Sequence, residues 1–113
     1  MVLYHWTRCS TCRKTREELL ARGSRPKERD FFAEPLAPAE LDRLAHEAGG
    51  LHAIASAASP SFRALGRPLK EWTEPELRQA ILREPRLLRR PILERDDGSL
   101  LVGARAIAGG AGS

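Results

Sequence analysis

The chain has 113 residues, of which 42% are hydrophobic and 30% are charged, so its length suits one domain and excludes two independent ones. Lys and Arg total 19 against 15 Asp and Glu, a net charge of +4, and 16 of the cations are Arg. Positive and negative residues alternate without a long basic block, so the charge pattern gives no strong signal for direct nucleic-acid binding.

The sequence predicts a cytoplasmic protein that does not contact a membrane. No stretch approaches the roughly 18–20 apolar residues of a membrane span, and the opening Met1-Val2-Leu3-Tyr4 is shorter than the apolar core of a secretion signal, about 7–15 residues. The chain has two cysteines, Cys9 and Cys12. In a reducing compartment, a Cys-x-x-Cys pair more often carries out redox chemistry or binds a metal than holds a fold together.

The first part of the chain predicts a strand, a helix and a second strand. The β-branched and aromatic run from Val2 to Trp6 is typical of a buried strand. Residues Ser10 to Arg22 favour a helix with Leu19 and Leu20 directed inward. Lys27 to Phe32 follows as a second strand. This order over about 30 residues has the length of a right-handed βαβ crossover, so we expect the two strands to be parallel.

The middle of the chain is mostly helical by its pattern. A helix is expected from Leu36 to the paired glycines after Ala48, and a second, short helix is expected within Ala53 to Ser61. Thr73 with Glu76 predicts a capping box at the start of a third helix. The expected buried stripe of that third helix consists of Leu77, Ala80 and Ile81.

The last part of the chain predicts a β-hairpin. Its strands are Ile92 to Arg95 and Leu100 to Gly103, joined through an Asp-Gly turn. Residues 108–113 are small, and we expect a flexible tail there. The fold class is therefore α/β, a mixed four-stranded sheet with flanking helices and an inserted helical lobe at about 36–84, in a single domain spanning 1–107.

The position of the cysteine pair favours a reactive thiol. If the helix begins at Ser10, Cys9 lies at its N-cap, where unpaired backbone N–H groups and the helix dipole stabilise a thiolate. Nearby cations add to this effect, and comparable surroundings lower thiol pKa values from about 8.5 to roughly 3.5–7.5. Cys12 lies one turn later, within reach of a disulfide and expected to be more buried. The nearby cations are Arg8, Arg13, Lys14 and Arg16.

Two other interpretations of the cysteine pair stay open. Zinc needs about four ligands, for which this chain offers only two Cys and three His, and the pair could also be unreactive in the core. We therefore expect neither a bound metal nor a cofactor. Near the hairpin, Arg89 or Arg90 could present a guanidinium to an anion at Cys9, with Pro91 shaping the site. The histidines, Trp6 and Trp72 are interpreted as packing or surface residues.

Three blocks of the chain resemble the arsenate reductase (ArsC)/Spx family, over residues 2 to 105. The blocks are Cys9-Ser10-Thr11-Cys12-Arg13-Lys14-Thr15-Arg16, Glu28-Arg29-Asp30-Phe31-Phe32-Ala33-Glu34-Pro35-Leu36 and Pro85-Arg86-Leu87-Leu88-Arg89-Arg90-Pro91-Ile92-Leu93. The resemblance implies a thioredoxin-like fold with an inserted helical lobe, which agrees with the predicted elements.

The resemblance also implies roles for individual residues. Cys9 matches the nucleophile, Arg90 an oxyanion-binding arginine, and Pro91 a cis-proline facing the cysteine. The candidate catalytic residues are therefore Cys9, Cys12 and Arg90, and the candidate substrate-binding residues are Arg13, Arg90 and Pro91. The implied activity is that of a thiol–disulfide oxidoreductase, arsenate reductase-like in its chemistry, with glutaredoxin and glutathione or thioredoxin as the reductant.

The chain departs from the arsenate reductase pattern at two places. Ala58 stands where relatives carry an arginine, and the final strand has Leu101-Val102-Gly103, with Arg105 only nearby. The alternative is an Spx-like redox-sensing regulator that binds the C-terminal domain of the RNA polymerase α subunit. The third interpretation is a family member that has neither activity.

Overall fold

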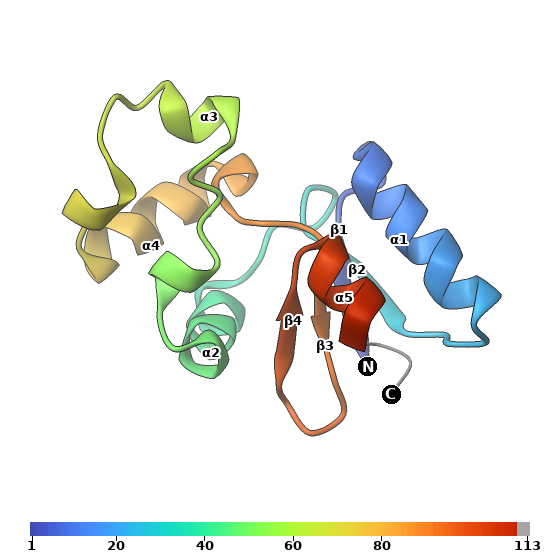
Figure 1. The fold of residues 1–113 in the computed structure, drawn as a ribbon. Helices are drawn as coiled ribbons and strands as arrows, with labels where there is room; N and C mark the ends of the chain where they lie inside the picture. The colour runs from blue at the N-terminus through green and yellow to red at the C-terminus, as the bar shows by residue number, and fades with distance from the viewer. Residues whose placement is uncertain (111–113) are drawn as a thin grey trace. The chain divides into compact units, whose positions relative to one another are not determined.

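The computed structural model describes residues 1–110, which form two compact units (Figure 1). The first unit is built from Met1–Glu34 and from the chain after Arg89, and the second is Pro35–Arg89. The predicted insertion at about 36–84 lies inside the second unit. Among the described residues, no helix combines the length and the apolar composition that a membrane span requires.

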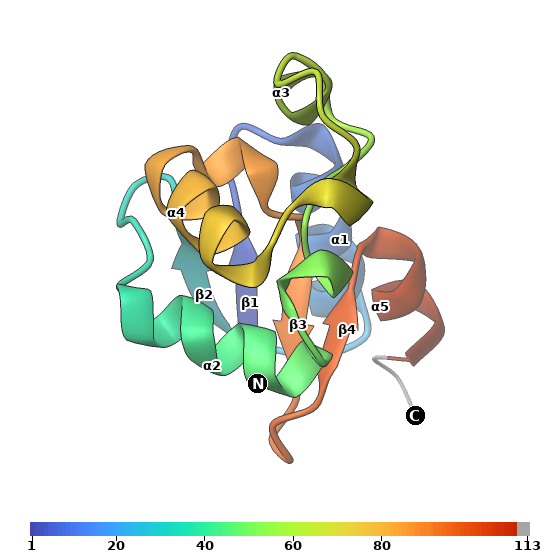
Figure 2. The same ribbon diagram turned by 90° about the vertical axis from the view of Figure 1, so that its left-hand side faces the viewer.

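The first unit contains a four-stranded sheet in the order β2-β1-β3-β4, which Figure 2 shows side by side. The parallel pair of β1 (Val2–His5) with β2 (Lys27–Asp30) confirms the βαβ prediction. The strands β3 (Ile92–Glu94) and β4 (Leu100–Val102) pair antiparallel, and β3 is also antiparallel to β1. The predicted mixed sheet and hairpin are therefore confirmed.

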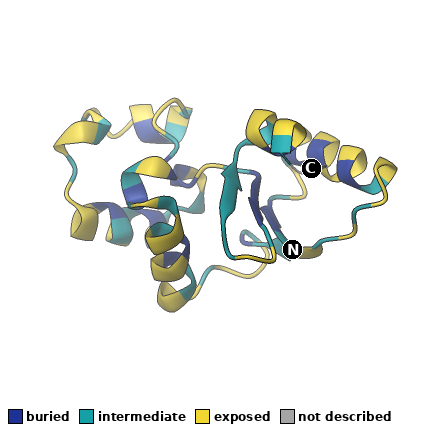
Figure 3. Ribbon diagram, turned by 60° about the horizontal axis from the view of Figure 1, so that its bottom comes forward, coloured by how far each residue is buried: buried dark blue, intermediate teal, exposed yellow. Residues whose placement is uncertain are grey.

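Two helices of the first unit, α1 (Ser10–Ala21) and α5 (Ala104–Gly110), contact each other, and α5 also contacts β3 and β4. The buried core beneath them contains residues from both the first part and the last part of the chain. Its members are Leu3, Leu19, Leu93 and Ile107, with Leu101 packed against them. Figure 3 shows the resulting contrast between the buried strands, β1 and β3, and the helices, which carry exposed residues along their whole length.

The second strand is shorter than predicted, because β2 ends at Asp30 and not at Phe32. The Asp30 carboxylate accepts hydrogen bonds from the N–H groups of Phe32 at 2.9 Å and Ala33 at 3.1 Å. A side chain that binds the backbone two and three residues ahead forms an Asx-type turn. Both aromatic residues after the strand, Phe31 and Phe32, therefore lie in a turn.

The predicted tail at 108–113 is wrong for residues 108–110, which belong to α5. This helix forms because Ile107 is 1% exposed and packs into the core, so tertiary contact outweighs the weak helix propensity of the glycines. Residues 111–113 of the predicted tail lie outside the described residues.

The second unit is helical and contains α2 (Pro38–Ala48), α3 (Pro60–Arg63) and α4 (Glu74–Arg83). Three-residue 3₁₀ helices lie at Leu51–Ala53, Leu69–Glu71 and Pro85–Leu87. Its buried apolar side chains include Leu41, Leu44, Ile54, Phe62, Leu77, Ile81 and Leu88.

The predicted helix within Ala53 to Ser61 is wrong, because part of this segment is extended. The N–H of Ser56 donates to the carbonyl of Leu87 at 2.7 Å, and the N–H of Arg89 donates to the carbonyl of Ile54 at 2.8 Å. Pairing with a distant segment takes the backbone groups that a helix would have used. Helix α3 begins only after Ser59, whose Oγ accepts from the N–H of Phe62.

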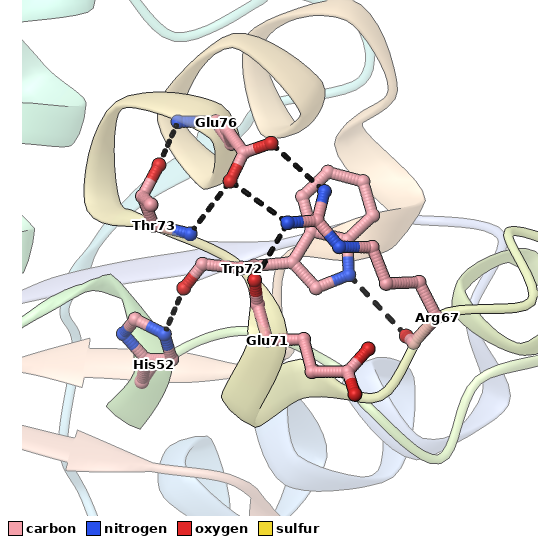
Figure 4. A network of polar contacts seen from close by, with 6 residues as sticks. All are labelled: His52, Arg67, Glu71, Trp72, Thr73 and Glu76. Atoms are coloured by element: carbon pink, nitrogen blue, oxygen red, sulfur yellow. Dashed lines mark hydrogen bonds and ion pairs between the residues drawn. The ribbon is translucent and has the colours of Figure 1, made fainter.

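The predicted capping box at the start of α4 is confirmed (Figure 4). Thr73 Oγ1 accepts from the N–H of Glu76, and the Glu76 carboxylate accepts from the N–H of Thr73. The Arg67 guanidinium donates two hydrogen bonds to Glu76, at 2.8 and 3.0 Å. This pairing, together with Thr73, lowers the pKa of Glu76 to about 2.

Candidate active site

Cys9 lies at the N-cap of α1, so the predicted helix start at Ser10 is confirmed. The N–H of Cys9 donates to the carbonyl of Trp6 at 3.0 Å, which closes the loop after β1. The carbonyl of Cys9 accepts from the N–H of Arg13 at 3.0 Å, which makes the first helical turn. The Cys9 side chain is partly exposed. A short loop thus brings this sulfur to the positive end of a helix, where solvent can reach it.

The surroundings of Cys9 favour its thiolate. Partial burial by itself would raise the pKa of the Cys9 thiol, but the N–H and thiol of Cys12 and the Arg90 guanidinium outweigh burial and lower this pKa. The N–H of Thr11 adds to the same effect. Because the thiolate is the reactive form of cysteine, Cys9 is nucleophilic at a lower pH than a free thiol.

The surroundings of Cys12 favour its protonated thiol. Burial, with the Cys9 sulfur beside it, raises the pKa of the Cys12 thiol to about 12, against opposing effects of the Trp6 N–H and Arg90. Its side chain is 0% exposed. Both cysteines are reduced in the structure. The pair therefore consists of a partly exposed cysteine whose pKa is lowered and a buried thiol that donates a hydrogen bond to its sulfur.

Arg90 supplies the positive charge that acts on both sulfurs. It lies just before β3, and its guanidinium carbon is 5.6 Å from the centre of the Trp6 ring and 5.5 Å from that of Phe32. These distances are in the range of cation–π contacts. The Arg90–Pro91 peptide bond is cis, as the resemblance implies, and Pro91 is buried.

Two basic residues on α1, Arg13 and Arg16, interact with groups other than the cysteines. Arg13 is exposed and donates to the carbonyl of Thr7 at 3.4 Å. Arg16 pairs with Glu28 at 2.6 Å, and Glu28 also lies 3.5 Å from the buried His5 ring. Of the cations singled out by the sequence, Arg90 is therefore the one whose charge lowers the pKa of Cys9.

The two places where the chain lacks an expected arginine have clear local structures. Ala58 is exposed in a turn of the second unit. Gly103 has a φ of +92° and donates its N–H to the carbonyl of Pro91 at 2.8 Å, so it joins β4 to α5 in a conformation that strains any residue with a side chain. Arg105 is exposed on α5.

Trp6 and Phe32 were not singled out as site residues by the sequence, which assigned Trp6 to packing or the surface. Their rings stack 4.3 Å apart and contact Arg90. The available signal was the position of Trp6 at the end of a strand, three residues before Cys9. Within residues 1–110, no group of three or more His, Cys, Asp or Glu side chains could hold a metal ion.

Comparisons with known proteins identify the family of the chain. The ArsC family model matches residues 4–106. The regulatory protein MgsR of Bacillus subtilis is 33% identical over 104 residues, covering 91% of this chain and 82% of that protein. The global transcriptional regulator Spx of Enterococcus faecalis is 36% identical over 104 residues, covering 91% and 78%.

The fold is also similar to that of solved structures. An arsenate reductase from Vibrio cholerae superposes with a TM-score of 0.78 at 24% identity, covering 95% of this chain and 92% of that one. The family model spans most of the chain, and the two regulators exceed 30% identity over most of their length. This chain therefore belongs to the ArsC family and has a thioredoxin-like fold.

Proposed function

We propose that this protein is a thiol–disulfide oxidoreductase in which Cys9 is the nucleophile and Cys12 the resolving cysteine. The observation that carries the proposal is that the two sulfurs differ in accessibility and in the direction of their pKa shifts. The pKa of Cys9 is lowered although the side chain is partly buried, while burial raises the pKa of Cys12 to about 12. The exposed sulfur thus attacks first, and the buried sulfur keeps its proton until the second step.

The reaction follows from this order. The Cys9 thiolate attacks one sulfur of a substrate disulfide, forming a mixed disulfide and releasing the other sulfur as a thiolate. Cys12 then loses its proton to solvent or to the departing thiolate and attacks Cys9, releasing the second substrate sulfur. Two electrons pass from the cysteine pair to the substrate, which leaves a Cys9–Cys12 disulfide. An external thiol reductant, glutaredoxin with glutathione or thioredoxin, returns two electrons.

Arsenate is the second substrate class for the same pair. The Cys9 thiolate would attack As(V), an As–O bond would break, and the oxygen would leave as water after protonation. A thiol attacking Cys9 would then leave the As–S electron pair on arsenic, giving As(III). Arg13, Arg90 and Pro91 are the proposed substrate-binding residues. Because Ala58 supplies no guanidinium, we favour a disulfide over arsenate as the substrate.

Matched cysteine variants test the proposal. Cys12→Ser should trap a mixed disulfide on Cys9 when the protein is mixed with an oxidised small-molecule disulfide, because the resolving thiol is missing. Cys9→Ser should form no adduct at neutral pH, since Cys12 is buried and protonated. Mass spectrometry of the intact proteins distinguishes the two outcomes, and parallel reactions with arsenate assign the substrate class.

The reduction potential of the pair is the second measurement. A value near roughly −270 to −200 mV would permit exchange with thioredoxin or glutaredoxin. Equal reactivity of the two cysteine variants, or failure of the pair to form a disulfide at such potentials, would refute the proposed oxidoreductase activity.

A second candidate function is redox-sensitive regulation of transcription. The observation favouring it is that relatives sharing 33% and 36% identity are named as a regulatory protein and a global transcriptional regulator. In this reading the Cys9–Cys12 disulfide alters affinity for the RNA polymerase α subunit. A pull-down with the α C-terminal domain under reducing and oxidising conditions tests it, and absence of binding in both states would exclude it.

A further inference from the structure

Two aromatic side chains beside the cysteine pair form a surface that we call the aromatic platform, consisting of Trp6 and Phe32. Their rings are stacked, with centroids 4.3 Å apart and planes inclined by 18°. The guanidinium carbon of Arg90 is nearly equidistant from the two ring centres, at 5.6 and 5.5 Å. The same cation therefore contacts both members of the platform.

The platform is built at one edge of the sheet. Trp6 directly follows β1, and Phe32 lies in the turn after β2, so the parallel pairing of these strands brings both residues to the same end. The Asp30 carboxylate ties the two loops together, accepting from the N–H of Thr7 at 3.2 Å and from that of Phe32 at 2.9 Å. Beneath the platform, the buried Phe31 ring lies 5.0 Å from that of Phe32.

The backbone of Trp6 is placed against both cysteines. Its carbonyl accepts the N–H of Cys9 at 3.0 Å, and its N–H faces the Cys12 sulfur. The main-chain contacts to the Cys9 N–H and to the Cys12 sulfur, and the ring contact to Arg90, thus start from a single residue. The position of the guanidinium is consequently coupled to the position of the thiolate.

We propose that Trp6 and Phe32 are positioning residues, which hold the Arg90 guanidinium beside Cys9 and so set the reactivity of its sulfur. The inference rests on the proposed function, because it assigns the platform to the same thiolate. The guanidinium has five N–H donors, so it can lie against the rings and still donate to an anionic sulfur or oxyanion.

A purely structural role for the platform makes a different prediction. If the rings only fill space, their removal lowers stability without changing the ionisation of Cys9. If they act through Arg90, their removal moves the pKa of Cys9, and this effect disappears when Arg90 is absent. The test is therefore the pH dependence of Cys9 alkylation by iodoacetamide, with the modified cysteine identified by peptide mass spectrometry.

We expect Trp6→Leu to raise the Cys9 midpoint by about half a pH unit, which means about threefold slower alkylation below the midpoint. Trp6→Phe keeps an aromatic face and should restore most of the wild-type value. Phe32→Leu should raise the midpoint as well, and it provides an independent test if Trp6→Leu does not fold. Circular dichroism of each variant establishes that it is folded.

A double-mutant cycle shows whether Trp6 acts through Arg90. Arg90→Ala alone should raise the Cys9 midpoint, and adding Trp6→Leu to it should give no further shift. A matched control is Trp72→Leu, which removes a Trp–Arg contact in the second unit. There the guanidinium carbon of Arg67 lies 4.6 Å from the centre of the Trp72 ring. This control should leave the Cys9 midpoint unchanged.

Three outcomes would overturn the inference: an unchanged midpoint in Trp6→Leu and Phe32→Leu, an equal shift in Trp72→Leu, or a full additional shift in the Arg90→Ala background. These differ from failure of the proposed function. In that case wild-type Cys9 itself would titrate at the ordinary thiol value, near about 8.5, or would form no disulfide with Cys12.

Discussion

Asp30 is a single side chain that organises the loops around the cysteine pair. Its carboxylate accepts hydrogen bonds from three backbone N–H groups, those of Thr7, Phe32 and Ala33. Partial burial by itself would raise the pKa of Asp30, but these N–H groups, led by that of Phe32, outweigh burial and lower it. The charged form of Asp30 is therefore the form that stabilises the folded protein.

Replacing Asp30 by Asn should reduce the free energy of unfolding by about 1–2 kcal/mol at neutral pH, because hydrogen bonds to a charged acceptor are stronger than those to an amide. The pKa of Asp30 is lower in the folded protein than in the unfolded chain, where it is about 3.9. The stabilisation by the charged carboxylate is therefore complete at pH values above about 3.9 and is lost as the pH falls through the pKa of the folded protein. Urea titrations at neutral and strongly acidic pH would measure it.

The matched control for Asp30→Asn is Glu17→Gln, at an exposed carboxylate on α1. It should change the free energy of unfolding by less than about 0.5 kcal/mol, as surface substitutions usually do. A difference between wild type and Asp30→Asn that persists unchanged into strong acid would contradict the charge-based explanation.

Among the helices, α4 has the most complete start. Thr73 and Glu76 exchange hydrogen bonds with each other's backbone, and Arg67 donates to the Glu76 carboxylate (Figure 4). The Trp72 indole N–H donates to the carbonyl of Arg67 at 3.3 Å, and His52 Nε2 lies 2.7 Å from the carbonyl of Trp72. The first turn of α4 is thus tied to the preceding loop, and this loop is tied to the 3₁₀ helix that contains His52.

We expect Thr73→Ala to destabilise the protein by about 1 kcal/mol, because the hydroxyl that satisfies an N-terminal N–H of the helix is lost. Thr73→Ser keeps the hydroxyl and should stay close to wild type. Chemical denaturation of both variants provides the measurement, and hydrogen exchange of the α4 amides localises the effect. Equal destabilisation by Ala and Ser would show that the methyl group, and not the cap, matters.

The core of the first unit draws on both ends of the chain. Leu3 and Leu19 come from its beginning, while Leu93 and Ile107 come from its last part, and all four are buried. This core holds β1 and α1, whose N-terminal end carries the cysteines, against β3, which begins two residues after Arg90. Stability of the core and assembly of the site are therefore linked.

Leu93→Ala should cost about 2–5 kcal/mol of folding free energy, since it removes a fully buried side chain from the central strand β3. Globular domains are stable by only about 5–15 kcal/mol, so the loss would lower the urea midpoint substantially. Leu65→Ala is the control, because Leu65 is 45% exposed and should change stability by less than about 0.5 kcal/mol. Similar costs for both would contradict the assigned core.

Most of the sheet was predictable because its signals are local. The strand Val2–His5, the helix that begins after Cys9 and the Asp-Gly hairpin each follow from short patterns of propensity and turn chemistry. The predictions were wrong where a distant partner decided the structure. Residues 108–110 became helical because Ile107 packs into the core, and the segment around Ala55 did not form a helix because it pairs with residues 87–89.

The amino-acid sequence by itself determined that Cys9 precedes a helix and that Cys12 follows one turn later, because helix capping depends on neighbouring residues. Tertiary structure alone decided which charge reaches these sulfurs. Arg13 and Arg16, which are near the cysteines in the chain, interact with other partners, whereas Arg90, remote in the chain, contacts the Trp6 and Phe32 rings. Electrostatic effects depend on distance in space, which only the pairing of β1 with β2 and β3 establishes.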